Sequence, residues 1–126
     1  MGPFRYPIGV ARLDGSAPET IEALVDTGAT YTWIPRQTLD RLGIAPTGRR
    51  RLQLADGQII ERESGLVLVT VDGITVATTC IFGDPGSLPL MGVVTLEECG
   101  LALDPVRQRL IPTVGLLASL ATNSSA

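Results

Sequence analysis

Two Asp-Gly pairs, each set between runs of apolar and β-branched residues, constrain the fold of this 126-residue chain more than any other feature. The first pair, Asp56-Gly57, follows leucines that alternate with polar residues, and the second, Asp72-Gly73, separates two long apolar runs. Asp-Gly is a preferred central pair of the type I′ turn, which joins adjacent antiparallel strands. We therefore predict two β-hairpins, over residues 50–62 and 66–82, with a type I′ turn at Asp56-Gly57.

The rest of the chain also favours short strands. Val, Ile and Thr together number 32, and turn residues recur every ten or so positions, which is typical of an all-β protein. Two short helices are predicted, one ended by Gly43 and one by Gly100, because glycine commonly ends helices. The further predicted strands cover residues 8–13, 21–25, 31–35, 101–103 and 109–111, and the predicted helices cover residues 36–42 and 93–99.

The composition excludes several kinds of chemistry. All ten basic residues are Arg, and the chain has neither His nor Lys. Triads that use His, His-ligated metal sites and Lys Schiff bases are therefore excluded. The net charge of −3 argues against nucleic-acid binding. The two cysteines, Cys80 and Cys99, are too few for a disulfide scaffold, and whether they pair with each other is left open.

The terminal segments give expectations about location. Residues 1–7 contain no apolar core of a signal peptide, and no apolar run approaches the length of a membrane span. We therefore expect a cytoplasmic protein without membrane contact. Apolar residues within 114–120 recur at helix-like spacing. Such a helix would pack either on its own domain or on a partner subunit.

One carboxylate stands out as a candidate for chemistry. Asp26 directly follows the apolar strand at 21–25, and Thr27-Gly28-Ala29 comes next. Apolar and aromatic neighbours on both sides predict a partly desolvated carboxylate, which is typical of functional sites. Gly28 allows a backbone or a ligand to approach closely. The alternative is a structural Asp that caps a turn.

These residues and the order of the later elements resemble the retropepsin-like aspartic proteases, the retroviral-type enzymes and their cellular relatives. Asp26-Thr27-Gly28-Ala29 matches the active-site signature of this family, and the hairpin at 52–62 lies where the family has its flap. Leu90-Met91-Gly92 matches the two apolar residues and glycine that precede the family's helix, here 93–99. The resemblance covers about residues 8–112.

The resemblance implies a fold and a reaction. The fold would be an all-β, closed acid-protease-type barrel with a flap hairpin and one short helix near the C-terminal third. Residues 1–112 would form the protease domain, and residues 113–126 a partly flexible C-terminal extension. Two subunits of a homodimer would each supply one Asp26, and the two carboxylates would activate a water that hydrolyses a peptide or protein substrate. No metal or organic cofactor is implied.

The resemblance also implies roles for the residues around the catalytic carboxylate. Thr27 would hydrogen bond across the dimer, Gly28 would contact the substrate backbone, and Ala29 would complete the active-site loop. The flap tip, which closes over the peptide, would consist of Asp56, Gly57 and Gln58. The loop would be supported from below by Leu90, Met91 and Gly92.

The chain departs from the viral pattern at two positions, and several alternatives stay open. Thr30 and Val93 replace an acid and an Arg that form an ion pair in the viral enzymes. Trp33 is either a packing residue or a platform for substrate. Residues 49–51, all Arg, are either a solvated strand start or a basic grip on an acidic partner. The alternatives to a protease are a non-catalytic peptide-binding or dimerisation module on the same fold, and a structural domain with an accidental Asp-Thr-Gly.

Overall fold

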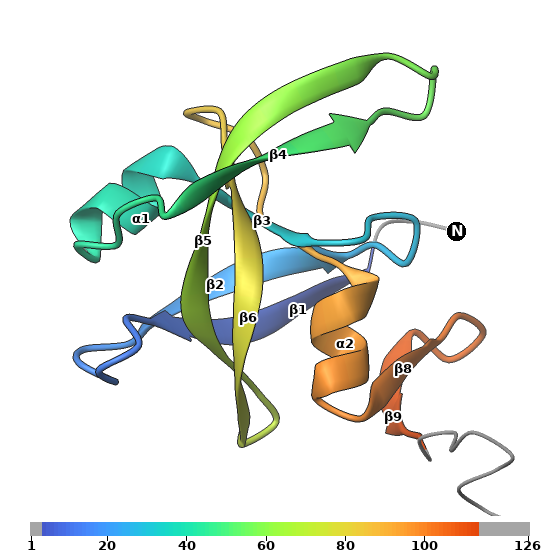
Figure 1. The fold of residues 1–126 in the computed structure, drawn as a ribbon. Coiled ribbons are helices and arrows are strands. Elements are labelled where there is room, and N and C mark those ends of the chain that lie inside the picture. Colours follow the sequence, from blue (N-terminus) through green and yellow to red (C-terminus); the bar gives the residue numbers. More distant parts are fainter. Residues whose placement is uncertain (1–3, 114–126) are drawn as a thin grey trace, which may run out of the picture.

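The computed structural model describes residues 4–113, so the apolar spacing at 114–120 and most of the predicted extension lie outside the described residues. Strands dominate this part of the chain, and two short helices interrupt them (Figure 1). The elements are β1 (Arg5–Ala11), β2 (Glu19–Val25), β3 (Thr32–Pro35), α1 (Arg36–Arg41), β4 (Gly48–Gln53), β5 (Ile59–Val71), β6 (Ile74–Gly83), β7 (Leu90–Met91), α2 (Val93–Glu98), β8 (Leu101–Asp104) and β9 (Arg109–Pro112).

The strands form one large sheet and one small one. The large sheet has seven strands in the order β1-β2-β7-β3-β6-β5-β4, and β5 also pairs with β1. The small sheet pairs β8 with β9 beside α2 (Figure 1). The prediction of a mostly β fold with two short helices is confirmed, whereas closure of the large sheet into a barrel stays a prediction. Neither helix described here is long and apolar enough to cross a membrane.

The core follows from the alternation of apolar residues along the strands. Val67, Val69 and Val71 of β5 are fully buried, while Leu66 on the opposite face is exposed. Successive side chains of a strand point to opposite faces, so this pattern turns one face of β5 toward the core. Buried residues of β1, β2, β3 and α2 pack against it in one cluster. Val25, the last residue of β2, belongs to this cluster, so the core packs against the strand end where the predicted site begins.

The two Asp-Gly hairpins form with different turns. Asp72 and Gly73 both have positive φ, 51° and 80°, between the paired residues Val71 and Ile74, as a type I′ turn requires. The type I′ prediction for Asp56-Gly57 is wrong, because only Gly57 has positive φ, 88°. There the Asp56 carboxylate accepts the Gln58 N–H at 2.9 Å, and the Gly57 N–H donates to the Leu54 carbonyl at 2.9 Å. This longer, five-residue connection makes a wider hairpin tip.

Two predicted strand boundaries are also wrong. The first strand begins at Arg5 and ends at Ala11, because the turn that follows already includes Arg12, whose carbonyl accepts the Gly15 N–H at 2.8 Å. The return strand of the first hairpin does not stop near residue 62 but continues as β5 to Val71. Gly65, which resembles a turn residue, instead allows close packing, since a Cβ there would lie 3.3 Å from both the Ala45 carbonyl oxygen and the Phe82 ring.

Candidate active site

Asp26 lies directly after β2, in a loop that closes on itself. Its side chain is half-buried, and its Oδ1 accepts the Gly28 N–H at 2.9 Å. The Ala29 N–H donates to the Asp26 carbonyl at 3.1 Å, which completes a tight turn. A Cβ on Gly28 would lie 3.2 Å from the Asp26 carboxylate. A side chain at position 28 would therefore crowd the Asp26 carboxylate, and glycine avoids this contact.

The segment around β7 supports the loop from below. Leu90 and Met91 pair in parallel with the last two residues of β2, and the Met91 carbonyl accepts the Asp26 N–H at 3.0 Å. The Val93 N–H donates to the Ala29 carbonyl at 2.8 Å. Backbone hydrogen bonds thus join the two segments that an Asp–Arg ion pair joins in the viral pattern. The structure brings together the predicted loop and the predicted supporting residues.

Gly92 is the point of closest packing between these segments. A Cβ at this position would lie 2.5 Å from both the carbonyl carbon and the carbonyl oxygen of Tyr31, and 2.7 Å from the Thr30 oxygen. No real Cβ atom is accommodated at such distances without movement of the backbone. Gly92 is therefore required so that α2 can begin directly beneath the Asp26 loop.

Three buried threonines, which the sequence gives no reason to single out, tie the same region together. Thr95 of α2 shares hydrogen bonds with Thr32 of β3 at 2.6 Å and with Thr78 of β6 at 3.0 Å. Thr32 Oγ1 also accepts the Gly92 N–H at 3.2 Å. All three threonines are at most 1% exposed, so their hydroxyl groups depend on one another rather than on water.

Replacing Thr95 by Val is expected to lower the free energy of unfolding by about 1–3 kcal/mol, because a buried hydroxyl partner is lost at nearly constant volume. Thr75→Val is the matched control. Thr75 shares a hydrogen bond of 2.7 Å with Thr70 at the exposed surface, so this change is expected to cost less than about 0.5 kcal/mol. Urea denaturation of both variants measures the difference. Equal losses in the two variants would contradict a structural role for the buried network.

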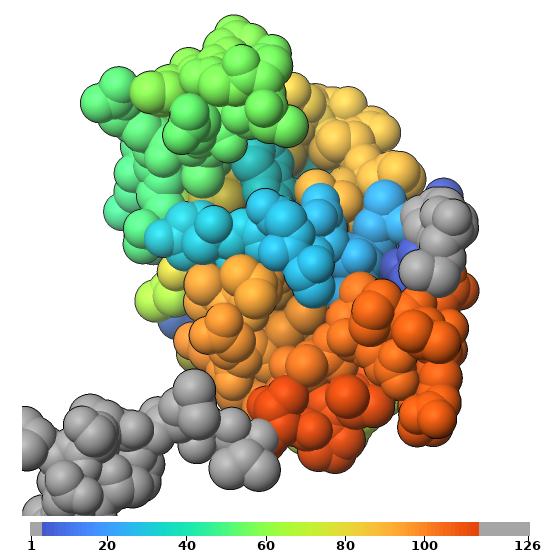
Figure 2. All heavy atoms as spheres, turned by 90° about the vertical axis from the view of Figure 1, so that its right-hand side faces the viewer, coloured from blue at the N-terminus to red at the C-terminus, as the bar shows by residue number. Residues whose placement is uncertain are grey.

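A cleft of about 530 Å³ opens above the Asp26 loop. Its floor contains Asp26, Gly28 and Ala29, and its sides contain Trp33 and Leu90. Residues 51–55, from β4 and the start of the hairpin tip, form the wall opposite the loop. Figure 2 shows the hairpin overhanging the loop, with a hollow between them. Asp26 thus lies in the wall of a cleft whose surface is about equally polar and apolar.

The predicted flap residues do not line the cleft. Asp56, Gly57 and Gln58 are exposed at the tip of the hairpin, and the cleft is lined instead by the residues that precede them. Trp33 lies in the cleft wall, half-buried, so its position fits a platform for substrate. The wall residues 51–55 were missed from the sequence, although their place on the first strand of a predicted flap could have indicated them.

Within residues 4–113, no group of three or more His, Cys, Asp or Glu side chains could hold a metal ion. Thr27 is exposed and its hydroxyl makes no hydrogen bond with any other described residue. The Thr27 hydroxyl therefore remains available to a group outside the described residues.

Both cysteines are buried and free. Burial raises the pKa of the Cys80 thiol from its ordinary value of 9.0 to about 12, because a thiolate is poorly solvated in the core that β6 helps to form. The folded state then retains a proton that the unfolded state has lost, so stability falls as the pH rises from about 9 to about 12. Cys80 is accordingly a core residue rather than a nucleophile.

Between about pH 9 and pH 12, we expect the free energy of unfolding to decline more steeply for the unchanged chain than for the Cys80→Ala variant. The difference arises because Ala carries no proton to lose, and it should amount to a few kcal/mol at most. Denaturant titrations at a series of pH values measure both slopes. Parallel slopes would show that Cys80 ionises equally readily in the folded and unfolded states.

Comparison with known proteins agrees with this geometry. The family model described as aspartyl protease matches residues 10–109, a range that includes the Asp26 loop, the hairpin and Gly92. The chain belongs to this retropepsin-like aspartyl protease family, so the resemblance seen in the sequence is confirmed. Membership supports a protease-type function. No curated protein matches the chain.

Proposed function

We propose that this chain is one half of an aspartic endopeptidase, completed by a second copy of itself. The observation that carries the proposal is the position of Asp26, whose carboxylate faces a peptide-sized cleft between the strand-end loop and an overhanging hairpin. One described chain contributes one such carboxylate, whereas hydrolysis by this chemistry uses two. The pairing of β1 with β5 would close the large sheet of each subunit into a barrel. Each barrel would hold the Asp26 loop of its own subunit in place.

In the proposed reaction, two Asp26 carboxyl groups share one proton, because two like charges at hydrogen-bond distance do not both ionise cheaply. The ionised carboxylate takes a proton from a water, and the water oxygen bonds to the scissile carbonyl carbon. The protonated carboxyl donates its proton to the carbonyl oxygen. When the tetrahedral intermediate collapses, the C–N bond breaks and the amine nitrogen receives the proton that the first carboxylate took from water. One hydroxyl of the intermediate gives its proton to the other carboxylate, which restores the singly protonated dyad.

The surrounding residues have defined parts in this proposal. Thr27, which is exposed and has no hydrogen-bond partner among residues 4–113, would hydrogen bond to the loop of the second subunit. Gly28 would leave room for the substrate backbone next to Asp26. The hairpin, including Asp56, Gly57 and Gln58 at its tip, would close over the peptide and exclude water. An extended peptide would pair with the strand edges that border the cleft.

Incubation with an unfolded protein, scanned over pH, tests the proposal. We expect cleavage that is blocked by a transition-state mimic of aspartic proteases, with a specific activity that rises with protein concentration as dimers form. A chain that binds such peptides without cleaving them at any pH would instead be a peptide-binding module. A specific activity independent of concentration down to monomeric protein would contradict the shared site.

A further inference from the structure

Two of the consecutive arginines of β4, Arg49 and Arg50, differ in their partners. Arg49 pairs with Glu61 at 2.8 Å across the hairpin. The next acid along β5, Glu63, pairs with Arg36 from α1. Arg50 has no carboxylate partner among the described residues. The acids nearest to Arg50 on the hairpin are therefore already used by other arginines, and its charge is not neutralised.

Arg50 is nevertheless held in one position. Its guanidinium lies over the Tyr31 ring, 4.7 Å from the ring centre, and its Nη1 donates to the Tyr31 hydroxyl at 2.9 Å. The remaining N–H groups, on Nε and Nη2, make no hydrogen bond with described residues. A guanidinium fixed by stacking loses little conformational entropy when it binds an anion. Arg50 is thus positioned to donate hydrogen bonds to an anion.

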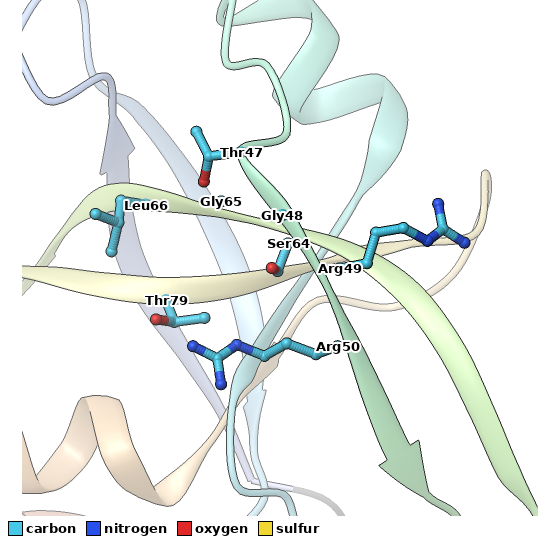
Figure 3. A pocket seen from close by; sticks show the side chains of 8 residues that line it. All are labelled: Thr47, Gly48, Arg49, Arg50, Ser64, Gly65, Leu66 and Thr79. Atoms are coloured by element: carbon cyan, nitrogen blue, oxygen red, sulfur yellow. The ribbon is translucent and has the colours of Figure 1, made fainter.

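A separate pocket of about 360 Å³ lies beside this guanidinium, between the start of β4 and the middle of β5 and β6 (Figure 3). In Figure 3 the Arg50 side chain extends toward Thr79, whereas Arg49 points away. The hydroxyl groups of Ser64 and Thr79 line the pocket and make no hydrogen bond with described residues. Ser64 is only 6% exposed, so its hydroxyl is a donor in the pocket wall without an acceptor among the described residues.

The charge around the pocket is positive. Arg50 lies directly opposite Arg62 in the hairpin register, and like charges at such positions destabilise a strand pair. Arg62 is only weakly compensated, since its ion-pair partner Asp84 is 3.4 Å away and largely exposed. An anion beside Arg50 would relieve this repulsion. A carboxylate fits the donors better than a neutral group does.

The pocket adjoins the cleft through one pair of side chains. Tyr31 lines the cleft, and Arg50, stacked on Tyr31, lines the pocket. We propose that this pocket binds an acidic side chain, Asp or Glu, of a peptide that lies in the Asp26 cleft. The carboxylate would accept hydrogen bonds from Arg50, Ser64 and Thr79. This inference rests on the proposed function, because it assigns a substrate preference to the same site.

Paired peptides that differ only in Glu or Gln, placed in turn at each position around one sequence, test the preference. Binding is measured by calorimetry with the Asp26→Asn chain, so that the result does not depend on cleavage. At one position we expect the Glu peptide to bind about tenfold more tightly than the Gln peptide, as for a charge-assisted hydrogen bond. Equal affinities at every position would overturn the inference.

Substitution of Arg50 separates charge recognition from a merely structural role. In an Arg50→Gln variant the ratio of the two affinities should fall to about one, whatever the change in overall binding. Arg107→Gln removes the same charge on the β8–β9 turn, outside both pockets, and should keep the tenfold ratio. A ratio unchanged by Arg50→Gln would also overturn the inference. If peptides are cleaved by the unchanged chain without a Glu preference, the proposed function stands and only the acidic subsite fails.

Discussion

Peptide hydrolysis is expected to fall by at least about a thousandfold when Asp26 is replaced by Asn, because an amide neither takes a proton from water nor donates one as a carboxyl does. The fold should be unchanged. Asn has nearly the same shape as Asp, and its carbonyl oxygen can still accept the Gly28 N–H, which the Asp26 carboxylate accepts at 2.9 Å.

Rates of cleavage of one peptide by both proteins, purified in the same way, measure this effect. The control is the free energy of unfolding, which should differ by less than about 1 kcal/mol between the two proteins. A second control is Asp40→Asn, at the exposed surface of α1 and outside the cleft lining, where hydrolysis should persist. Retained activity in Asp26→Asn would show that the hydrolysis has another origin.

The Gly92→Ala variant is expected to lose about 3 kcal/mol or more of stability. The added methyl group would lie 2.5 Å from the Tyr31 carbonyl, and all the atoms that it would contact belong to the backbone. Neither segment is free to yield, since the Val93 and Val94 N–H groups bond to the Ala29 and Thr30 carbonyls at 2.8 and 3.0 Å. Any shift that relieves the contact therefore displaces the Asp26 loop, and activity should fall together with stability.

Gly9→Ala provides the comparison for this substitution. A Cβ on Gly9 of β1 would lie 3.4 Å from the Thr70 Cβ, an ordinary contact, so its effect should stay within about 1 kcal/mol. Chemical denaturation of both variants gives the two values. A Gly92→Ala protein as stable as Gly9→Ala would mean that the approach of α2 to the loop is looser than described.

Much of the fold could be predicted because it depends on local signals. Asp72-Gly73 specifies its own turn, since both residues adopt positive φ readily, and Gly43 and Gly100 end the two helices as predicted. The Asp26 loop was identified by four adjacent residues. The turn type at Asp56-Gly57 was predicted wrongly. The Asp56 carboxylate accepts the Gln58 N–H, and the dipeptide alone does not indicate this hydrogen bond to the following residue.

The features missed from the sequence depend on residues far apart in the chain. Thr95 meets Thr32, 63 positions earlier, inside the folded core, and neither position alone indicates the other. Gly65 of β5 packs closely against Phe82 of β6, 17 positions later. Arg50 acquires its orientation from Tyr31. Such contacts follow from the sheet order, which periodicity alone does not determine.

The central claim is that two copies of Asp26 form one site. Mixing the unchanged chain with the Asp26→Asn chain tests this claim most directly. If subunits exchange freely, mixed dimers hold one carboxylate and are inactive, so an equal amount of the variant should reduce total activity to about half. A ninefold excess should reduce it to about a tenth. Activity that stays constant at every ratio, with mass spectrometry showing that mixed dimers have formed, would contradict a shared site.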